Sequence, residues 1–221
     1  MPGIRRRALI DLDAFRSQLS GDVLDGRADA FGHGLALIAP VALSAGVREL
    51  VVSDDRDAGV ALAAGFAPRA VRRDRDARGA SADAYGLAGA GRPVLSLVGE
   101  VVALKRVEAS AGVSYGYTYR TPSPTTLALV ALGYADGVPR LASNRARVRV
   151  GDGTHPLVGR IAMDQLVLDV GDAPIELGAD AVLFGDPARG EPSPHDWAIW
   201  TERSPLALTA GIATRVAREA R

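Results

Sequence analysis

Strand-like segments separated by glycine-containing turns fill residues 112–165, and this stretch restricts the fold more than any other part of the sequence. Tyr115, Tyr117 and Tyr119 stand at alternate positions, which predicts a β-strand, since residues two apart share one face of a strand. The apolar run at residues 126–132 ends in a glycine, so it predicts a second strand followed by a tight turn. The stretch therefore predicts successive strands joined by short connections.

Strands continue after that run. Residues 148–150 and 157–162, joined through a GDG turn, predict a hairpin, because glycines suit a tight turn between apolar segments. Residues 166–170 and 181–186 are also strand-like, and a serine–proline pair predicts a capped helix at residues 193–201. The C-terminal part is thus predicted to be mostly β.

Short strands and helices alternate in the N-terminal part. Apolar runs flanked by helix-capping residues predict, in chain order, a strand at 8–10, a helix entered at Asp11 or Asp13, a helix at 35–45, a strand at 49–52 and a helix at 54–64. Pro40 predicts a kink or an early end in the second of these helices. The alternation indicates an α/β segment.

Charge and composition exclude several classes of function. Lys+Arg and Asp+Glu are both 26, so no net charge favours nucleic acid or an anionic membrane. There is no cysteine, which excludes disulfides, thiolate metal sites and a cysteine nucleophile, and the spacing of the three histidines predicts no metal site. Asp11 follows the N-terminal arginines too closely for a signal peptide, and the longest uncharged run, 31–47, is short for a membrane span. We expect a soluble cytoplasmic protein.

Three motifs occur in one order: GVSYG at 112–116, GYADG at 133–137 and GRIAMDQ at 159–165. This succession resembles the C-terminal β-domain of alanine racemases, enzymes that use pyridoxal phosphate (PLP) in D-alanine metabolism. The likeness runs from about Arg92 to near the C-terminus and includes the KRV residues that begin at Lys105. It implies an isomerase family and a β-domain over residues 93–221.

The resemblance assigns roles to five residues. Tyr115 matches one of the family's two catalytic bases, whereas from the residue alone it reads as a half-buried strand aromatic. Tyr134 and Met163 match residues that line the substrate mouth, and Arg140 and Asp164 match a pair in the entry channel.

A second likeness covers the N-terminal part, whose IDLDA phrase at 10–14 resembles the start of the racemase barrel. The family's KADAYGHG motif is matched by RADAFGHG at 27–34, so the lysine that holds PLP aligns with Arg27 and a nearby tyrosine aligns with Phe31. A guanidinium stays charged and cannot form the aldimine that PLP requires, and phenylalanine lacks the hydroxyl. The only lysine in the chain is Lys105, which the resemblance puts on a β-domain strand outside the cofactor pocket.

The barrel itself is predicted to be incomplete. A (β/α)8 barrel takes roughly 200–250 residues, whereas 92 residues precede the β-domain. We predict a truncated α/β barrel remnant over residues 1–67 and a linker or irregular loop, rich in alanine, glycine, arginine and aspartate, over 68–92. The expected fold class is α+β and multidomain: a mostly-β C-terminal domain preceded by an incomplete α/β, partial TIM-barrel segment.

These observations predict a degenerate racemase homologue without autonomous activity and without a bound cofactor. Because family racemases are head-to-tail dimers, we expect a homodimer or a heterodimer with a full-length racemase. One alternative is that this chain donates Tyr115 in trans to a full-length racemase partner. A second alternative is a pseudoenzyme that binds a small amino acid, another small carboxylate or a protein, and a third is a relic of a decayed gene. Neither nucleic acid nor a membrane is expected as a partner.

Overall fold

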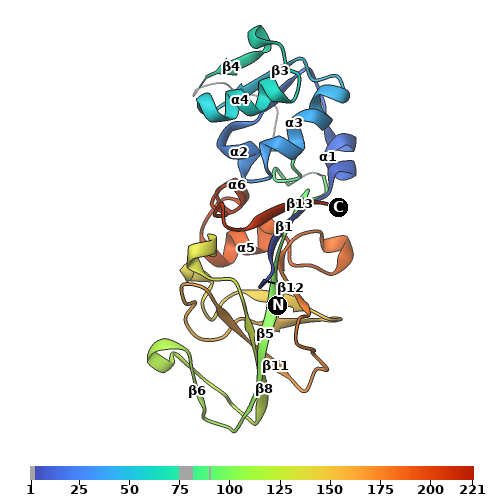
Figure 1. The fold of residues 1–221 in the computed structure, drawn as a ribbon. Coiled ribbons are helices and arrows are strands. Elements are labelled where there is room, and N and C mark those ends of the chain that lie inside the picture. The colour runs from blue at the N-terminus through green and yellow to red at the C-terminus, as the bar shows by residue number, and fades with distance from the viewer. Residues whose placement is uncertain (1–2, 75–81, 90) are drawn as a thin grey trace.

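The computed structural model describes residues 3–74, 82–89 and 91–221. Figure 1 shows an elongated molecule, with a small α/β part at one end and the strands of a larger sheet at the other. The C-terminus lies between these two parts, beside the N-terminal strand β1. None of the helices in the described ranges combines the length and apolar character that a membrane crossing requires.

One eight-stranded sheet organises most of the chain. Its strands are β1 (Arg6–Ile10), β5 (Leu95–Val107), β8 (Thr125–Val130), β9 (Arg147–Val150), β10 (Gly153–Pro156), β11 (Leu166–Gly171), β12 (Asp180–Phe184) and β13 (Ala217–Ala220). The order β10-β9-β12-β5-β1-β13 forms the main path, and β8 joins β5 to β11. The 13 residues of β5 hold the sheet together, since this strand pairs with β1, β12 and β8. The mostly-β fold predicted for the C-terminal part is confirmed.

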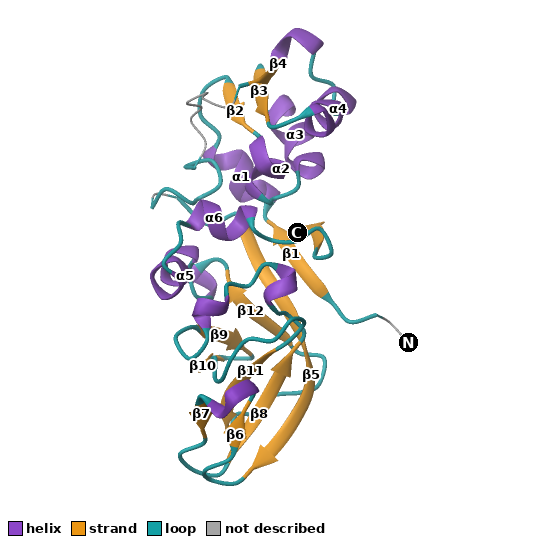
Figure 2. Cartoon of the chain, turned by 90° about the vertical axis from the view of Figure 1, so that its left-hand side faces the viewer, coloured by secondary structure: helices purple, strands orange, loops and turns teal. Residues whose placement is uncertain are grey.

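The predicted N-terminal strand is confirmed, and it belongs to the large sheet. β1 pairs antiparallel with β5, where Arg6 faces Gly99, and parallel with β13, where Arg7 faces Ala217. Its apolar residues Ala8 and Ile10 are fully buried. Strands close to the two ends of the chain therefore lie side by side in one sheet (Figure 2).

The small parallel sheet has the order β2-β3-β4. Its strands are β2 (Val23–Asp25), β3 (Glu49–Val52) and β4 (Val71–Arg73), and the helices around it are α1 (Leu12–Gln18), α2 (Arg27–Phe31), α3 (Leu35–Ser44) and α4 (Asp55–Ala63). Of the two caps predicted for α1, Asp11 is the one that caps the helix through its carboxylate, and Asp54, predicted as the first residue of a helix, caps α4 in the same way. The early end considered for α3 is wrong, because Ile38, Ala39 and Ala42 are buried on both sides of Pro40 and hold the last turn.

Two strand predictions in the β-rich part are wrong. Tyr115–Tyr117 forms a 3₁₀ turn instead of a strand, because Gly116 at φ 72° and Tyr117 at φ 46° cannot continue an extended chain. Only Tyr119 lies in a strand, β7 (Tyr119–Arg120), which pairs with β6 (Gly112–Val113). The second hairpin strand is found at residues 153–156 and not at 157–162, because β10 follows a two-residue turn after β9 and pairs with it directly.

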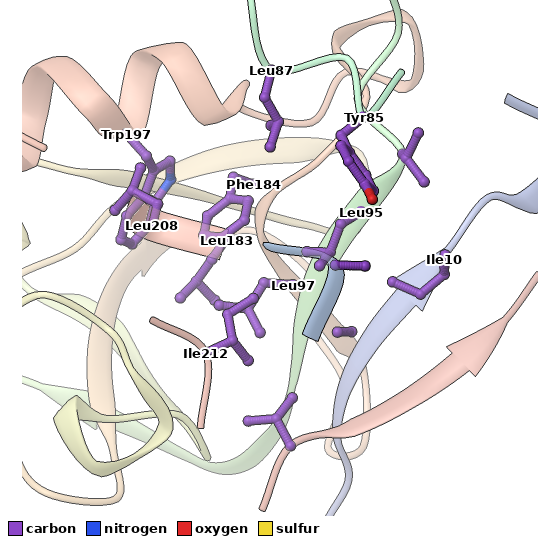
Figure 3. Close-up of a cluster of buried hydrophobic side chains, with 14 of the residues drawn as sticks. Ile10, Tyr85, Leu87, Leu95, Leu97, Leu183, Phe184, Trp197, Leu208 and Ile212 are labelled. Atoms are coloured by element: carbon purple, nitrogen blue, oxygen red, sulfur yellow. The ribbon is translucent and has the colours of Figure 1, made fainter. Parts of the chain in front are cut away.

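The C-terminal helices complete the fold. The helix predicted at 193–201 is α5 (Pro194–Thr201), whose first turn is capped by the Ser193 hydroxyl, and it is followed by α6 (Pro205–Ala210). Figure 3 shows Trp197 of α5 and Leu208 of α6 beside Leu183 and Phe184 of β12. The rings of Phe184 and Trp197 lie 5.7 Å apart, so the helices cover the sheet through a continuous apolar core.

The segment predicted as a linker over residues 68–92 contains β4 and a buried tyrosine. Tyr85 is fully buried, and its hydroxyl donates to the backbone carbonyl of Asp25 at 2.9 Å. The Tyr85 ring lies 5.5 Å from the rings of both Phe15 and Phe31. Residues 75–81 and 90 of this segment lie outside the described residues. The described part of 82–92 thus packs directly against the end of strand β2.

Candidate functional site

Two of the three motifs meet through their backbones. The Tyr134 N–H donates to the Ala162 carbonyl at 3.0 Å, and the Ala135 N–H donates to the Met163 carbonyl at 2.9 Å. These bonds seat the 3₁₀ turn Tyr134–Asp136 on the loop before β11. The contact is close because Gly133 has no side chain there: a Cβ on Gly133 would lie 2.3 Å from the Met163 carbonyl oxygen. Tyr134 and Met163 are thereby placed side by side.

The first motif joins the same group. The Ser114 hydroxyl donates to the Arg160 carbonyl at 2.5 Å, and the Asn144 side chain accepts from the Gly159 N–H at 2.6 Å. Asn144 also donates to the Thr118 hydroxyl at 3.2 Å. The turn that carries Tyr115 is therefore held against the loop that carries Met163.

The side chains of this site are presented to solvent. Tyr115 is 70% exposed, Met163 53% and Tyr134 41%. The reading of Tyr115 as a half-buried strand aromatic is therefore wrong, because the 3₁₀ turn directs its ring outward. Large apolar side chains gathered on one surface are typical of a binding face.

Arg140 and Asp164 are not paired with each other among the described residues. The Arg140 guanidinium lies over the Tyr134 ring, 5.5 Å from its centroid, in a cation–π contact. Asp164 instead accepts a hydrogen bond from Arg215 at 2.7 Å. Arg140 thus positions the tyrosine ring, and Asp164 belongs to a separate ion-pair network.

Asp136 is the centre of that network. Its fully buried carboxylate accepts from the Gly133 N–H at 2.8 Å and from Arg215 Nε at 2.7 Å, and lies 3.4 Å from Arg6 Nε. Hydrogen bonds to Asp136, and then to Asp164, raise the pKa of Arg215 above its usual range. Sequence reasoning missed these residues: Asp136 is in the GYADG motif, but nothing in the sequence marks Arg215, 79 residues away, as its partner.

Replacing Asp136 with asparagine is expected to destabilise the fold by about 2 kcal/mol, because a buried charge-assisted hydrogen bond is lost while Arg215 and Arg6 remain. Urea unfolding followed by the tryptophan fluorescence measures the change. Asp172→Asn is the matched control: its ion pair with Arg106 is exposed on both sides, so removing it should change stability by less than about 0.5 kcal/mol. Equal effects of the two substitutions would contradict the central role of Asp136.

Arg27 follows β2 directly and begins α2 in the small α/β part. Its guanidinium forms a two-point contact with Asp25, Nη2 to Oδ2 at 2.6 Å and Nε to Oδ1 at 2.8 Å. The residues that follow, 28–31, all have φ between 50° and 55°, so α2 is a left-handed turn. Each such residue costs roughly 1–2 kcal/mol, and the turn persists because bonds such as Ala28 N–H to the Ser53 hydroxyl, 2.7 Å, hold it.

His33 is buried directly after that turn. Its Nδ1 lies 2.9 Å from the Ala30 carbonyl, which makes Nδ1 the donor, and its Nε2 has no hydrogen-bond partner in the described part of the chain. The imidazole also lies 4.7 Å from the Tyr85 ring. Burial, with a smaller contribution from the Arg218 guanidinium, lowers the pKa of His33 to about 4.

The residues around Tyr115 and the residues around Arg27 do not come into contact within one chain. In Figures 1 and 2, α2, which begins at Arg27, lies in the small α/β part, whereas the β6–β7 hairpin around Tyr115 lies at the opposite end of the molecule. The structure therefore brings Tyr115, Tyr134 and Met163 together and keeps them apart from Arg27 and Phe31.

Comparison with known proteins identifies the relatives of this chain. The family model for the alanine racemase C-terminal domain matches residues 94–220. An alanine racemase of Salinispora arenicola is 48% identical over 118 residues, which are 53% of this chain and 31% of that protein. An alanine racemase of Streptomyces coelicolor is 47% identical over 127 residues, 58% of this chain and 32% of that protein. In these alignments the matched part of the chain spans about a third of each relative's length.

Solved structures extend the likeness of the fold. The alanine racemase of Streptomyces lavendulae has a TM-score of 0.88 at 23% identity, with 100% of this chain and 98% of that chain covered. That of Oenococcus oeni has a TM-score of 0.83 at 14% identity, with 99% of each chain covered. At such identities the likeness establishes the fold alone. The match of the family model over residues 94–220, more than half of the sequence, shows that the chain belongs to the alanine racemase family through its C-terminal domain.

Proposed function

We propose that this chain is a racemase-family protein that does not racemise amino acids by itself. The observation that carries the proposal is the contact between Arg27 and Asp25. PLP bound as an aldimine requires a neutral amine, whereas the Arg27 guanidinium is a permanent cation held on two points by a carboxylate. The residues at this position do not fit the cofactor.

The surroundings of Arg27 support the same proposal. Phe31 has no hydroxyl to offer a ligand, and its ring packs edge-on against the buried ring of Tyr85. Tyr85 in turn uses its hydroxyl on the Asp25 carbonyl. The Tyr85 side chain thus packs at the end of β2, where a barrel enzyme of this family keeps its cofactor lysine.

The purified chain is expected to show no racemase activity and no aldimine band that borohydride fixes to Lys105 when PLP is added, because Lys105 is its only lysine and lies on β5. Absorbance spectra and an alanine racemisation assay measure both. A Lys105→Arg variant, which has no lysine at all, serves as the control. Racemisation by the wild type that Lys105→Arg abolishes would contradict the proposal and make Lys105 the cofactor lysine.

Donation of Tyr115 to a full-length racemase is the second candidate. It is favoured by the exposure of Tyr115 on a turn that Ser114 and Asn144 hold in place, at the end of the molecule opposite Arg27. A surface of this kind is suited to complete a site on another subunit.

The donor role is tested by copurifying the tagged chain from its host and assaying the complex for alanine racemisation. We expect a full-length racemase to be recovered and Tyr115→Phe to lower the activity of the complex. Tyr117→Phe is the matched control, since Tyr117 is 62% exposed on the same turn. Recovery of the chain alone, or equal activity with both variants, would rule out donation.

A further inference from the structure

A cleft opens on the β5–β8–β11 face of the large sheet. It has a volume of about 250 Å³, and its floor is formed by Ala103 and Lys105 of β5, Leu127 and Leu129 of β8, and Val167 of β11. The β6 strand of the hairpin, residues 112–113, borders it together with Ser114. Ligand pockets for drug-sized molecules are roughly 300–1,000 Å³, so this cleft suits a smaller molecule.

The sheet register explains why the floor is apolar. Leu129 pairs with Ala103 on one side and with Val167 on the other, so these three side chains form one row across the sheet. All three are half-buried, which leaves their apolar surface accessible from the cleft. The alternate residues of β8, Ala128 and Val130, face inward and are fully buried. The cleft is therefore a separate apolar surface outside the main core.

The next row gives the cleft its charge. Lys105 pairs with Leu127, which pairs with Asp169. The Asp169 carboxylate is engaged by the hydroxyls of Tyr119, at 2.8 Å, and Thr125, and it does not line the cleft. Lys105 makes no hydrogen bond or ion pair with any described residue. An apolar floor thus ends at one unpaired ammonium group.

We propose that this cleft binds a small apolar carboxylate, with its hydrocarbon part on the Ala103–Leu129–Val167 row and its carboxylate on the Lys105 ammonium. The aliphatic stem of lysine covers apolar surface while its charged end remains at the rim, which is the arrangement that such an amphiphilic anion requires. No carboxylate lines the cleft to compete for the ammonium group. The site involves neither Arg27 nor the side chains of Tyr134 and Met163, so it stands independently of the proposed function.

The single lysine makes the site directly observable. Reductive methylation with ¹³C-formaldehyde keeps the charge of an amine and labels only Lys105 and the N-terminal amine. The Lys105→Arg variant identifies the Lys105 signal by its loss. Titration with octanoate is expected to shift the Lys105 signal saturably and leave the N-terminal signal in place. Octylamine, which has the same chain and the opposite charge, is expected to shift neither.

Calorimetry with octanoate on unlabelled protein separates the contribution of the Lys105 charge to binding from that of the shape of the cleft. Lys105→Met, which keeps the apolar stem, should weaken binding about tenfold or more, whereas Lys105→Arg should bind as the wild type does. Ala103→Leu adds three carbons inside the cleft and should weaken binding while keeping the charge. Equal affinity of wild type and Lys105→Met, or equal binding of octanoate and octylamine, would overturn the proposal. A Lys105 signal that shifts on dilution without ligand would also overturn it, because a second copy of the chain would then cover this face.

Discussion

Gly133→Ala is expected to destabilise the protein by about 3–5 kcal/mol, which is a large part of the stability of an ordinary domain. Gly133 has φ −146°, a conformation that alanine adopts freely, so the effect is purely steric. The added Cβ would lie 2.3 Å from the Met163 carbonyl oxygen and 2.4 Å from that of Ala162. The two loops must separate, and the hydrogen bonds from Tyr134 and Ala135 break with them.

Urea unfolding measures this loss, with the buried Trp197 as the fluorescent reporter. Gly59→Ala is the matched control, because Gly59 lies inside α4 and a Cβ there would meet nothing within 4 Å. That substitution should stabilise the protein by about 0.5–1 kcal/mol, since alanine favours a helix interior. A Gly133→Ala protein within 1 kcal/mol of the wild type would mean that the Tyr134 turn and the Met163 loop are not held together as described.

Acidification is expected to remove about 3 kcal/mol of stability through His33 alone. Burial lowers the pKa of His33 in the folded protein to about 4, against 6.5 for an ordinary histidine, and each unit of difference corresponds to about 1.4 kcal/mol. The unfolded chain therefore binds the proton first. The stabilising contribution is complete above pH 6.5, is lost as the pH falls from 6.5 to 4, and does not change further below that range.

The contribution of His33 is isolated by comparing unfolding free energies at pH 7 and pH 4. The decrease between the two values should be about 3 kcal/mol smaller in His33→Gln than in the wild type. His155→Gln is the control: burial also lowers the pKa of His155, but this side chain is only partly buried, and the variant should keep most of the decrease. An NMR titration in which the His33 ring protonates near pH 6.5 would refute the prediction.

The His33 prediction concerns the small α/β part and the Gly133 prediction concerns the part built on the large sheet, and the C-terminal segment links the two parts. Arg218, on β13, donates to the Gly32 carbonyl at 3.1 Å beside the left-handed turn. Gly32 itself lies so close to α6 that a Cβ there would overlap the Thr209 carbonyl. The small α/β part is thus held by the C-terminal segment as well as by β1, and we infer that it folds together with the large sheet.

Local features of the chain were predictable from the sequence. The strands at 8–10, 49–52, 166–170 and 181–186 were found because apolar runs bounded by turn residues encode them. Asp11, as one of two candidates, and Ser193 are predictable as caps because a capping side chain bonds a backbone N–H two or three residues away. The three motifs at 112–116, 133–137 and 159–165 identified the family for the same reason: each is a short contiguous pattern.

Positions that depend on distant partners were decided only by the tertiary structure. The alternate tyrosines at 115, 117 and 119 suggested a strand, but the turn is imposed by Gly116 and by the loop on which it packs. The pairing of Asp136 with Arg215 and the placement of Tyr85 against Asp25 join residues 79 and 60 positions apart. A periodic pattern of apolar residues in the sequence indicates only which face of a helix or strand is apolar. Which distant element covers that face, and which buried charge meets which cation, depends on the path of the whole chain, because burial makes an unpaired polar group costly wherever its partner lies in the sequence.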